Sequence, residues 1–116
     1  MSDLDDGLTL RQLQEEMRPW VLHNFGKRPS YWPLLGAVEE IGELCHAHLK
    51  NEQKIRTNED HREQKLDAIG DILIYLADYC SAENIDLQQV LEDTWESVKL
   101  RDWKKNSQTG KVEEVK

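Results

Sequence analysis

The sequence predicts an all-α protein with a single domain of four helices. Apolar residues recur at helical spacing in four segments, and no alternating pattern typical of β-strands is present. At 116 residues, with 38% hydrophobic and 33% charged residues, the chain is long enough to bury a core without covalent staples. We expect the helical domain at 8–105, between a short N-terminal tail, 1–7, and a polar C-terminal tail, 106–116.

The first helix is expected to begin at a capping box formed by Thr9 and Gln12. Its apolar residues at helical spacing are Leu10, Leu13, Met17, Trp20 and Val21. Pro19 lies inside this pattern, and we expect it to kink or divide the helix. The glycine and proline that follow indicate a loop at 23–29.

The second helix is expected from about Ser30 to Lys50, since a proline at position 33 is tolerated in a first turn. The segment 51–60 is polar and lacks periodicity, which indicates an exposed loop. Asp60 is expected to cap a third helix that continues to about Ala82.

Asp86, with Gln89 three residues later, is expected to cap the fourth helix. The apolar residues of this helix are Leu87, Val90, Leu91, Trp95 and Val98. From Lys104 onward the chain is polar and lysine-rich, so we expect a frayed tail.

The formal net charge of −8 argues against a nucleic acid polymer as partner, because such a partner needs a basic face. A small nucleotide held through a metal ion is compatible with this charge. No apolar run approaches the roughly 20 residues that span a bilayer, and no secretory signal is expected. We expect Cys45 and Cys80 to be reduced core thiols rather than a disulfide, which predicts a cytoplasmic protein.

Two acidic clusters lie within apolar stretches of the second and third helices. Glu40 and Glu43 are one turn apart, as are Asp67 and Asp71. The third helix is apolar on nearly all sides around Asp71, which predicts that this carboxylate is buried and needs a partner. The glutamates alone are also compatible with a solvated helix face. Taken together, the clusters predict an oxygen-only site for Mg²⁺ or Mn²⁺.

A di-iron site is the other metal centre to weigh. Glu43 and His46 have the Glu-x-x-His spacing of di-iron bundles. That architecture needs two such motifs, and only one lies on a convincing helix. His46 is therefore expected at a helix edge or on the surface.

The segments 39–43, Glu-Glu-Ile-Gly-Glu, and 70–76, Gly-Asp-Ile-Leu-Ile-Tyr-Leu, resemble the MazG-like all-α nucleoside triphosphate pyrophosphohydrolases. The resemblance covers roughly residues 8–105. It implies a four-helix MazG-like fold that assembles as a homodimer or homotetramer, with sites near subunit contacts. It also implies hydrolysis of a nucleoside triphosphate to a monophosphate and pyrophosphate, with Mg²⁺ or Mn²⁺ as cofactor.

By position, the resemblance makes Glu40, Glu43 and Asp71 metal ligands. Glu39 or Glu43 would orient or deprotonate the attacking water. One departure concerns the second motif, in which the family glutamate falls on Ala68. Either Asp67 takes this role, or the site holds fewer metals, or activity is weak or lost.

Substrate-binding residues follow from the same resemblance. Tyr75 matches a position near the nucleotide, and Trp32, Phe25 and His23 precede the acidic helix where relatives contact the base. Aromatic residues so close to a helix start are also common in a core. The cations expected to hold phosphates are Lys99, Arg101, Lys104 and Lys105, with Lys27 and Arg28 as further options. Each is equally readable as an ordinary surface charge.

Two alternatives remain open. One is a catalytically weak or inactive helical oligomer that acts as a nucleotide-binding or regulatory module, which Ala68 favours. The other is a ribosyl-ATP pyrophosphohydrolase or a dUTPase of the same superfamily, which would differ only in substrate.

Overall fold

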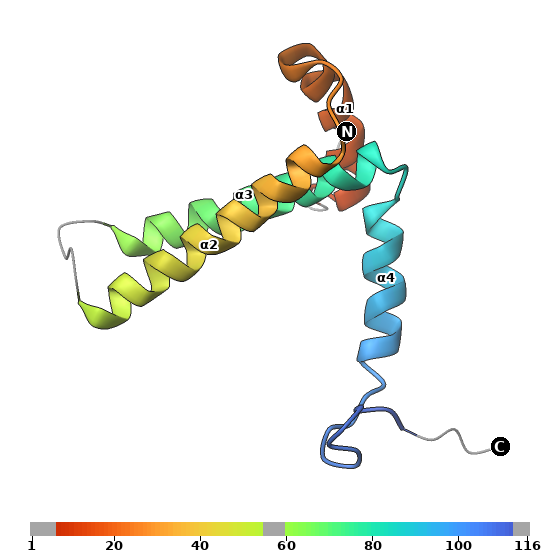
Figure 1. Cartoon of the computed structure of the whole chain (residues 1–116). Coiled ribbons are helices and arrows are strands. Elements are labelled where there is room, and N and C mark those ends of the chain that lie inside the picture. Colours follow the sequence, from red (N-terminus) through yellow and green to blue (C-terminus); the bar gives the residue numbers. More distant parts are fainter. Residues whose placement is uncertain (1–6, 55–59, 113–116) are drawn as a thin grey trace.

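The computed structural model describes residues 7–54 and 60–112, and within these ranges the secondary structure is entirely helical (Figure 1). The helices are α1 (Leu10–Phe25), α2 (Tyr31–Gln53), α3 (His61–Ala82) and α4 (Leu87–Val98). The predicted all-α class and element order are therefore confirmed. Part of the expected loop at 51–60 lies outside the described residues, and α2 extends three residues beyond the predicted Lys50.

The predicted starts of α1, α3 and α4 are confirmed by side-chain caps. The Thr9 hydroxyl accepts from the Gln12 backbone N–H at 3.1 Å, and the Gln12 side chain accepts from the Thr9 N–H at 2.8 Å. Asp60 and Asp86 cap α3 and α4 in the same way, by accepting from the third residue of each helix. Each cap satisfies backbone donors that would otherwise lack a partner.

Pro19 lies inside one uninterrupted helix, so it does not divide α1. The missing N–H removes one helical hydrogen bond. Pro19 is exposed, and water can satisfy the carbonyl that loses its partner.

α2 and α3 lie side by side as a long helical hairpin (Figure 1). The buried residues along this hairpin are mostly small: Gly36, Ala37, Ala47, Ala68 and Ala77. Gly36 gives space to the Tyr75 ring of α3, because a Cβ at position 36 would lie 2.6 Å from Tyr75 Cδ1 and 2.7 Å from Cζ. Small side chains thus let α2 and α3 approach closely and let one aromatic ring lie across α2.

Gln14 of α1 connects the hairpin to α4. Its side chain is buried and donates to the Ser81 hydroxyl at 3.2 Å and to the Ile85 carbonyl at 2.9 Å. It also accepts from the Leu87 N–H, the first residue of α4, at 2.9 Å. An Arg11–Asp86 ion pair at 3.0 Å closes the same junction. These contacts fix the point from which α4 leaves the hairpin.

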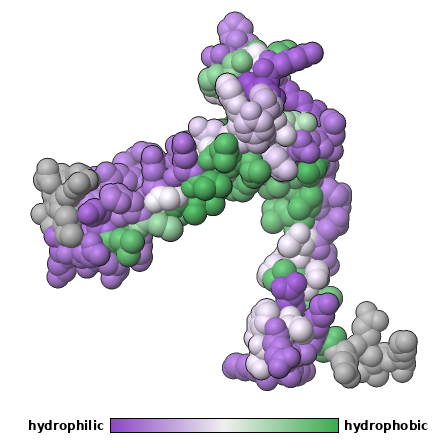
Figure 2. Space-filling model, viewed as in Figure 1, coloured by the Kyte–Doolittle hydropathy of each residue, from purple (hydrophilic) through white to green (hydrophobic). Residues whose placement is uncertain are grey.

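Beyond that junction the molecule is open. α4 projects away from the hairpin (Figure 1), and apolar surface lines the faces that the hairpin and α4 turn toward the angle between them (Figure 2). The radius of gyration of 18.4 Å exceeds the ~13 Å typical of a compact chain of about 100 residues. The single chain therefore leaves amphipathic faces without a partner.

Large apolar residues that recur at helical spacing along α2 and α3 are exposed: Leu34, Val38, Ile41, Leu66, Ile69 and Leu73. This exposure is unusual, because the apolar stripe of an amphipathic helix is ordinarily buried. Asp71 is also exposed, so the expectation that it is buried within the chain is wrong. The small-residue face packs instead, because it allows the closer approach of the two helices.

Cys45 and Cys80 are both free thiols, as expected, and Cys80 is buried, but the expectation that Cys45 lies in the core is wrong because it is exposed. The tail is not frayed through residue 112: the Asp102 N–H donates to the Gly110 carbonyl at 2.6 Å, and the Asn106 side chain accepts from two backbone N–H groups. A Trp103 ring over Gly110 completes this folded turn, because glycine leaves room for the ring. No helix in the described ranges is long and apolar enough to cross a bilayer.

Candidate functional site

The acidic residues of α2 and α3 form one electrostatic cluster. Glu40 is half-buried, and this partial burial raises its pKa above the ordinary value of 4.5. The negative charges of Glu43, Asp71 and Glu39 raise the same pKa further, in that order. Asp71 comes from the neighbouring helix, so the hairpin brings carboxylates of both predicted motifs within electrostatic reach. Like charges crowded in this way favour a proton or a cation.

The donor set of this cluster suits a hard divalent cation. All four groups are carboxylates, the ligand type that Mg²⁺ and Mn²⁺ prefer. Glu39, Glu43 and Asp71 are exposed, so they remain free to rotate. Among residues 7–54 and 60–112, no three acidic, histidine or cysteine side chains are already gathered around one point. The described carboxylates thus interact electrostatically, but no three of them surround one point.

Ala68 and Asp67 occupy different environments. Ala68 is only 2% exposed, on the helix that packs along α2. A glutamate at this position would have to fit among the small residues of the hairpin. Asp67 is exposed and precedes Asp71 by one turn. The alanine therefore serves the packing of α3, and Asp67 is the carboxylate left available beside Asp71.

A cavity of about 560 Å³ adjoins the acidic cluster, and Glu39 and Asp71 belong to its wall. Its aromatic lining residues are Trp20, Phe25, Tyr31, Trp32 and Tyr75. The volume lies in the range typical of small-molecule sites. The structure thus brings the expected Trp32, Phe25 and Tyr75 together beside two of the expected acidic residues. Aromatic faces next to carboxylates suit a ligand with a flat ring and a metal-bound anion.

One ion pair forms part of the same wall. Arg28 donates to Asp78 Oδ2 at 2.6 Å, and both side chains are only 13% exposed. The guanidinium carbon lies 5.2 Å from the centre of the Phe25 ring, which in turn contacts Trp20 edge-on at 5.7 Å. Such a buried, stacked pair is geometrically fixed.

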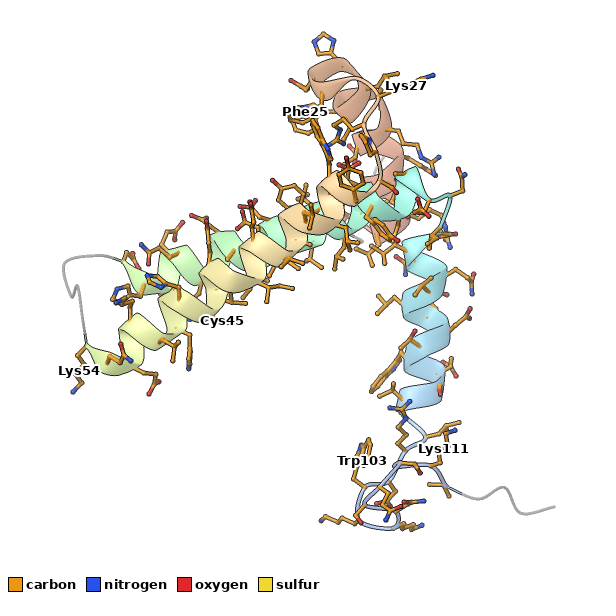
Figure 3. All side chains as sticks on the ribbon, in the orientation of Figure 1. Phe25, Lys27, Cys45, Lys54, Trp103 and Lys111 are labelled. Carbon is orange, nitrogen blue, oxygen red and sulfur yellow. The ribbon has the colours of Figure 1, made fainter. Side chains whose placement is uncertain are left out.

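The other expected substrate-binding residues lie elsewhere in the single chain. His23 is exposed in the last turn of α1 and does not line the cavity. Lys99 pairs with Glu96 at 2.8 Å, and Arg101 and Lys104 are exposed in the folded turn after α4. Figure 3 shows how far this turn, marked by Trp103, lies from Phe25 beside the cavity.

Sequence reasoning missed Trp20 and Tyr31 as cavity residues, and it did not pair Arg28 with Asp78. A signal for Asp78 was present, because it follows Asp71 by seven residues and so lies on the same side of α3. The partner Arg28 comes from a loop, whose course no periodicity reveals.

Comparison with known proteins adds no relative. Neither the family models, nor the curated proteins, nor the solved structures contain a match to this chain.

Proposed function

We propose that this protein is a metal-dependent nucleoside triphosphate pyrophosphohydrolase that cleaves a ribo- or deoxyribonucleoside triphosphate to monophosphate and pyrophosphate. The main support for the proposal is that the carboxylate cluster adjoins an aromatic-lined cavity, with Glu39 and Asp71 in the cavity wall. The order of the two acidic motifs, which resembles the MazG-like family, supports the same reaction.

In this proposal Glu40, Glu43 and Asp71 hold Mg²⁺ or Mn²⁺, and Asp67 is a further ligand. The bound metal would neutralise charge that develops on the phosphate oxygens. Glu39 borders the cavity, where it is suited to orient the attacking water and accept its proton; Glu43 is the second choice for this role. Trp32 and Tyr75 offer flat surfaces on which the base can stack.

The phosphate-binding cations are proposed to come from a second copy of the chain. Lys99, Arg101 and Lys104 follow α4, on which the apolar residues Val90, Leu91 and Trp95 are exposed. A homodimer or homotetramer that covers α4 would bring these cations to a neighbouring subunit. His23, which is exposed, is a further substrate contact in such an assembly.

Two conservative substitutions test the site. Glu43→Gln and Asp71→Asn should each reduce pyrophosphate release by at least about 100-fold, because each removes a metal-binding charge. Far-UV circular dichroism should stay unchanged, since both residues are exposed. Glu83→Gln, an exposed carboxylate at the end of α3, is the matched control and should retain activity. Full activity in both site variants would overturn the assignment.

Buried Ala68 favours a second candidate, a nucleotide-binding module without turnover. Isothermal calorimetry with Mn²⁺ separates the two functions. The pyrophosphohydrolase should bind the ion at the cluster, and Asp67→Ala should weaken that binding. Equal affinity in wild type and Asp67→Ala would remove Asp67 from the ligand set. A chain that binds nucleotide but no divalent ion would be the inactive module.

A further inference from the structure

The aromatic-lined cavity carries a net negative charge. Its described lining residues include three carboxylates, Glu39, Asp71 and Asp78, and one cation, Arg28. Arg28 and Asp78 neutralise each other in their ion pair at 2.6 Å. Glu39 and Asp71 form no ion pair within residues 7–54 and 60–112, and both are exposed. The wall therefore presents two uncompensated carboxylates, and a ligand with a positive charge would complement it.

The aromatic rings of the wall also suit a cation. The face of a Trp, Tyr or Phe ring attracts a cation within about 6 Å of its centre, and Trp does so most strongly. One such contact is already present, because the Arg28 guanidinium carbon lies 5.2 Å from the centre of the Phe25 ring. Trp20 and Trp32 line the same cavity and are each 54% exposed, so a ligand can reach their rings.

Tyr75 lies among the carboxylates of the wall. It follows Asp71 by four residues and precedes Asp78 by three, so these side chains share one side of α3. On α2, Gly36 makes room for the Tyr75 ring, and Glu39 follows Gly36 by three residues. A flat ligand ring stacked beside Tyr75 would thus have a carboxylate about one helical turn away on both α2 and α3.

We propose that this cavity selects nucleotides whose base carries a positive charge, such as a base alkylated at a ring nitrogen, over nucleotides with a neutral base. This inference rests on the proposed function for the phosphate end of the site. The cationic ring stacks on Trp32 and Tyr75, and the Glu39 carboxylate stabilises its charge. A nucleoside triphosphate that binds one Mg²⁺ remains an anion, so a positive base also offsets its repulsion by the acidic wall.

The basis of this selection is charge rather than the hydrogen-bonding edge of the base. Unmodified adenine, guanine, cytosine, uracil and thymine are all neutral at pH 7, so they form one disfavoured class. Methylation of a ring nitrogen, such as N1 of adenine, places a positive charge on the ring. Methylation of the exocyclic amino group of adenine adds the same methyl group without a charge. These two products therefore separate the effect of charge from the effect of added apolar surface.

Isothermal calorimetry with nucleosides tests the selection on the full chain, with neither phosphate nor divalent ion present. Wild type should bind 1-methyladenosine, a cation at pH 7, at least about 5-fold more tightly than the neutral N6-methyladenosine. Glu39→Gln keeps the shape of the side chain but removes its charge, so it should reduce this ratio by about half or more. Trp32→Leu removes a ring face and should have the same effect. Glu52→Gln, at an exposed carboxylate further along α2, is the control and should leave the ratio unchanged.

Equal affinity for the two nucleosides, or no measurable affinity for either, would overturn the inference. So would an unchanged ratio in Glu39→Gln, which decides the question even if Trp32→Leu fails to fold. Tetramethylammonium, a cation without a flat ring, should bind more weakly than 1-methyladenosine. Equal binding of these two cations would mean that the cavity recognises charge without a base, which would also contradict the inference.

The proposed function can fail separately from base selection. A chain that prefers 1-methyladenosine but releases no pyrophosphate from any nucleoside triphosphate would support the cation site and contradict the hydrolase alone. A chain that releases pyrophosphate from 1-methyl-ATP and from ATP with equal kcat/KM would support the hydrolase and contradict the selection of charged bases alone.

Discussion

At the scale of single residues, Glu40 and Gly36 are the two positions that matter most for the site. Partial burial of Glu40, and then the nearby carboxylates of its own helix and of α3, raise its pKa. Gly36, one turn earlier, makes room for the Tyr75 ring in the cavity wall. Gly36 thus shapes the cavity wall, and Glu40 lies one turn further along α2, in the acidic cluster beside that cavity.

Glu40→Gln should raise the thermal midpoint by a few degrees at pH 7. The folded state holds the Glu40 proton more tightly than the unfolded state, so ionised Glu40 destabilises the fold once the pH exceeds its raised pKa. Below the ordinary pKa of 4.5 the residue is protonated in both states, and the difference should vanish. Thermal unfolding followed by circular dichroism at several pH values measures this difference in midpoint between wild type and variant.

Glu83→Gln is the control for these melts, because Glu83 lies just beyond the end of α3, about three turns from Asp71, and the variant should leave the midpoint unchanged. A Glu40→Gln protein that is less stable than wild type at pH 7 would contradict the crowding of these carboxylates. Added Mg²⁺ should stabilise wild type more than the variant, since the ion relieves the same repulsion.

Gly36→Ala should destabilise the protein by about 1–3 kcal/mol, because its methyl group would overlap the Tyr75 ring. Gly42→Ala on the same helix meets open space and should be neutral or stabilising by up to about 1 kcal/mol. Urea unfolding gives both values. Combining Gly36→Ala with Tyr75→Ala should restore part of the loss, and an undiminished loss in the double variant would show that the ring is not the cause.

At the scale of elements, local sequence signals fixed where helices begin, but not which faces they bury. The caps at Thr9, Asp60 and Asp86 lie where capping chemistry predicts, because they depend on residues three positions apart. The buried face of α2 depends instead on α3. Leu34 and other large apolar residues recur at helical spacing but are exposed, whereas the small residues pack inside the hairpin.

Some features of the candidate site could likewise be predicted from local sequence, and others could not. The acidic motifs were predictable, since helical spacing places Glu40 beside Glu43 and the hairpin needs only to bring Asp71 opposite them. The Arg28–Asp78 pair and the buried Gln14 were not predictable, because each joins segments at least 50 residues apart. No local pattern records such a contact.

Gln14→Met should destabilise the protein by about 1–3 kcal/mol, since it leaves the Leu87 N–H and the Ile85 carbonyl without their partner. Amide exchange at Leu87 should become faster as the start of α4 loosens. Glu16→Met, at an exposed position of α1, is the control and should change neither quantity. Unchanged exchange at Leu87 would exclude Gln14 as the anchor of α4.

At the scale of the whole molecule, an open chain must cover its apolar faces. Figure 2 shows this surface along the hairpin and α4, and Trp95 and Leu91 are each more than half exposed on α4. A chain in this form would leave an apolar patch in water, which favours self-association. The exposed apolar surface of the whole molecule is therefore the reason to expect a homo-oligomer.

Trp95→Glu should shift the protein toward monomer in light scattering coupled to gel filtration, because it places a charge on the apolar side of α4. Gln89→Glu adds the same charge on the polar side and should leave the mass unchanged. Loss of pyrophosphate release together with assembly in Trp95→Glu would support cations supplied by a second copy. A wild-type protein that is monomeric at micromolar concentration would contradict the oligomer.

The most direct test of the central claim is the identity of the products. Wild-type protein is incubated with Mg²⁺ and each common nucleoside triphosphate, and ³¹P NMR follows the phosphorus species. The proposed function predicts monophosphate and pyrophosphate in equal amounts from at least one nucleotide, and none without a divalent ion. Formation of diphosphate and inorganic phosphate, or no hydrolysis of any nucleotide, would contradict it.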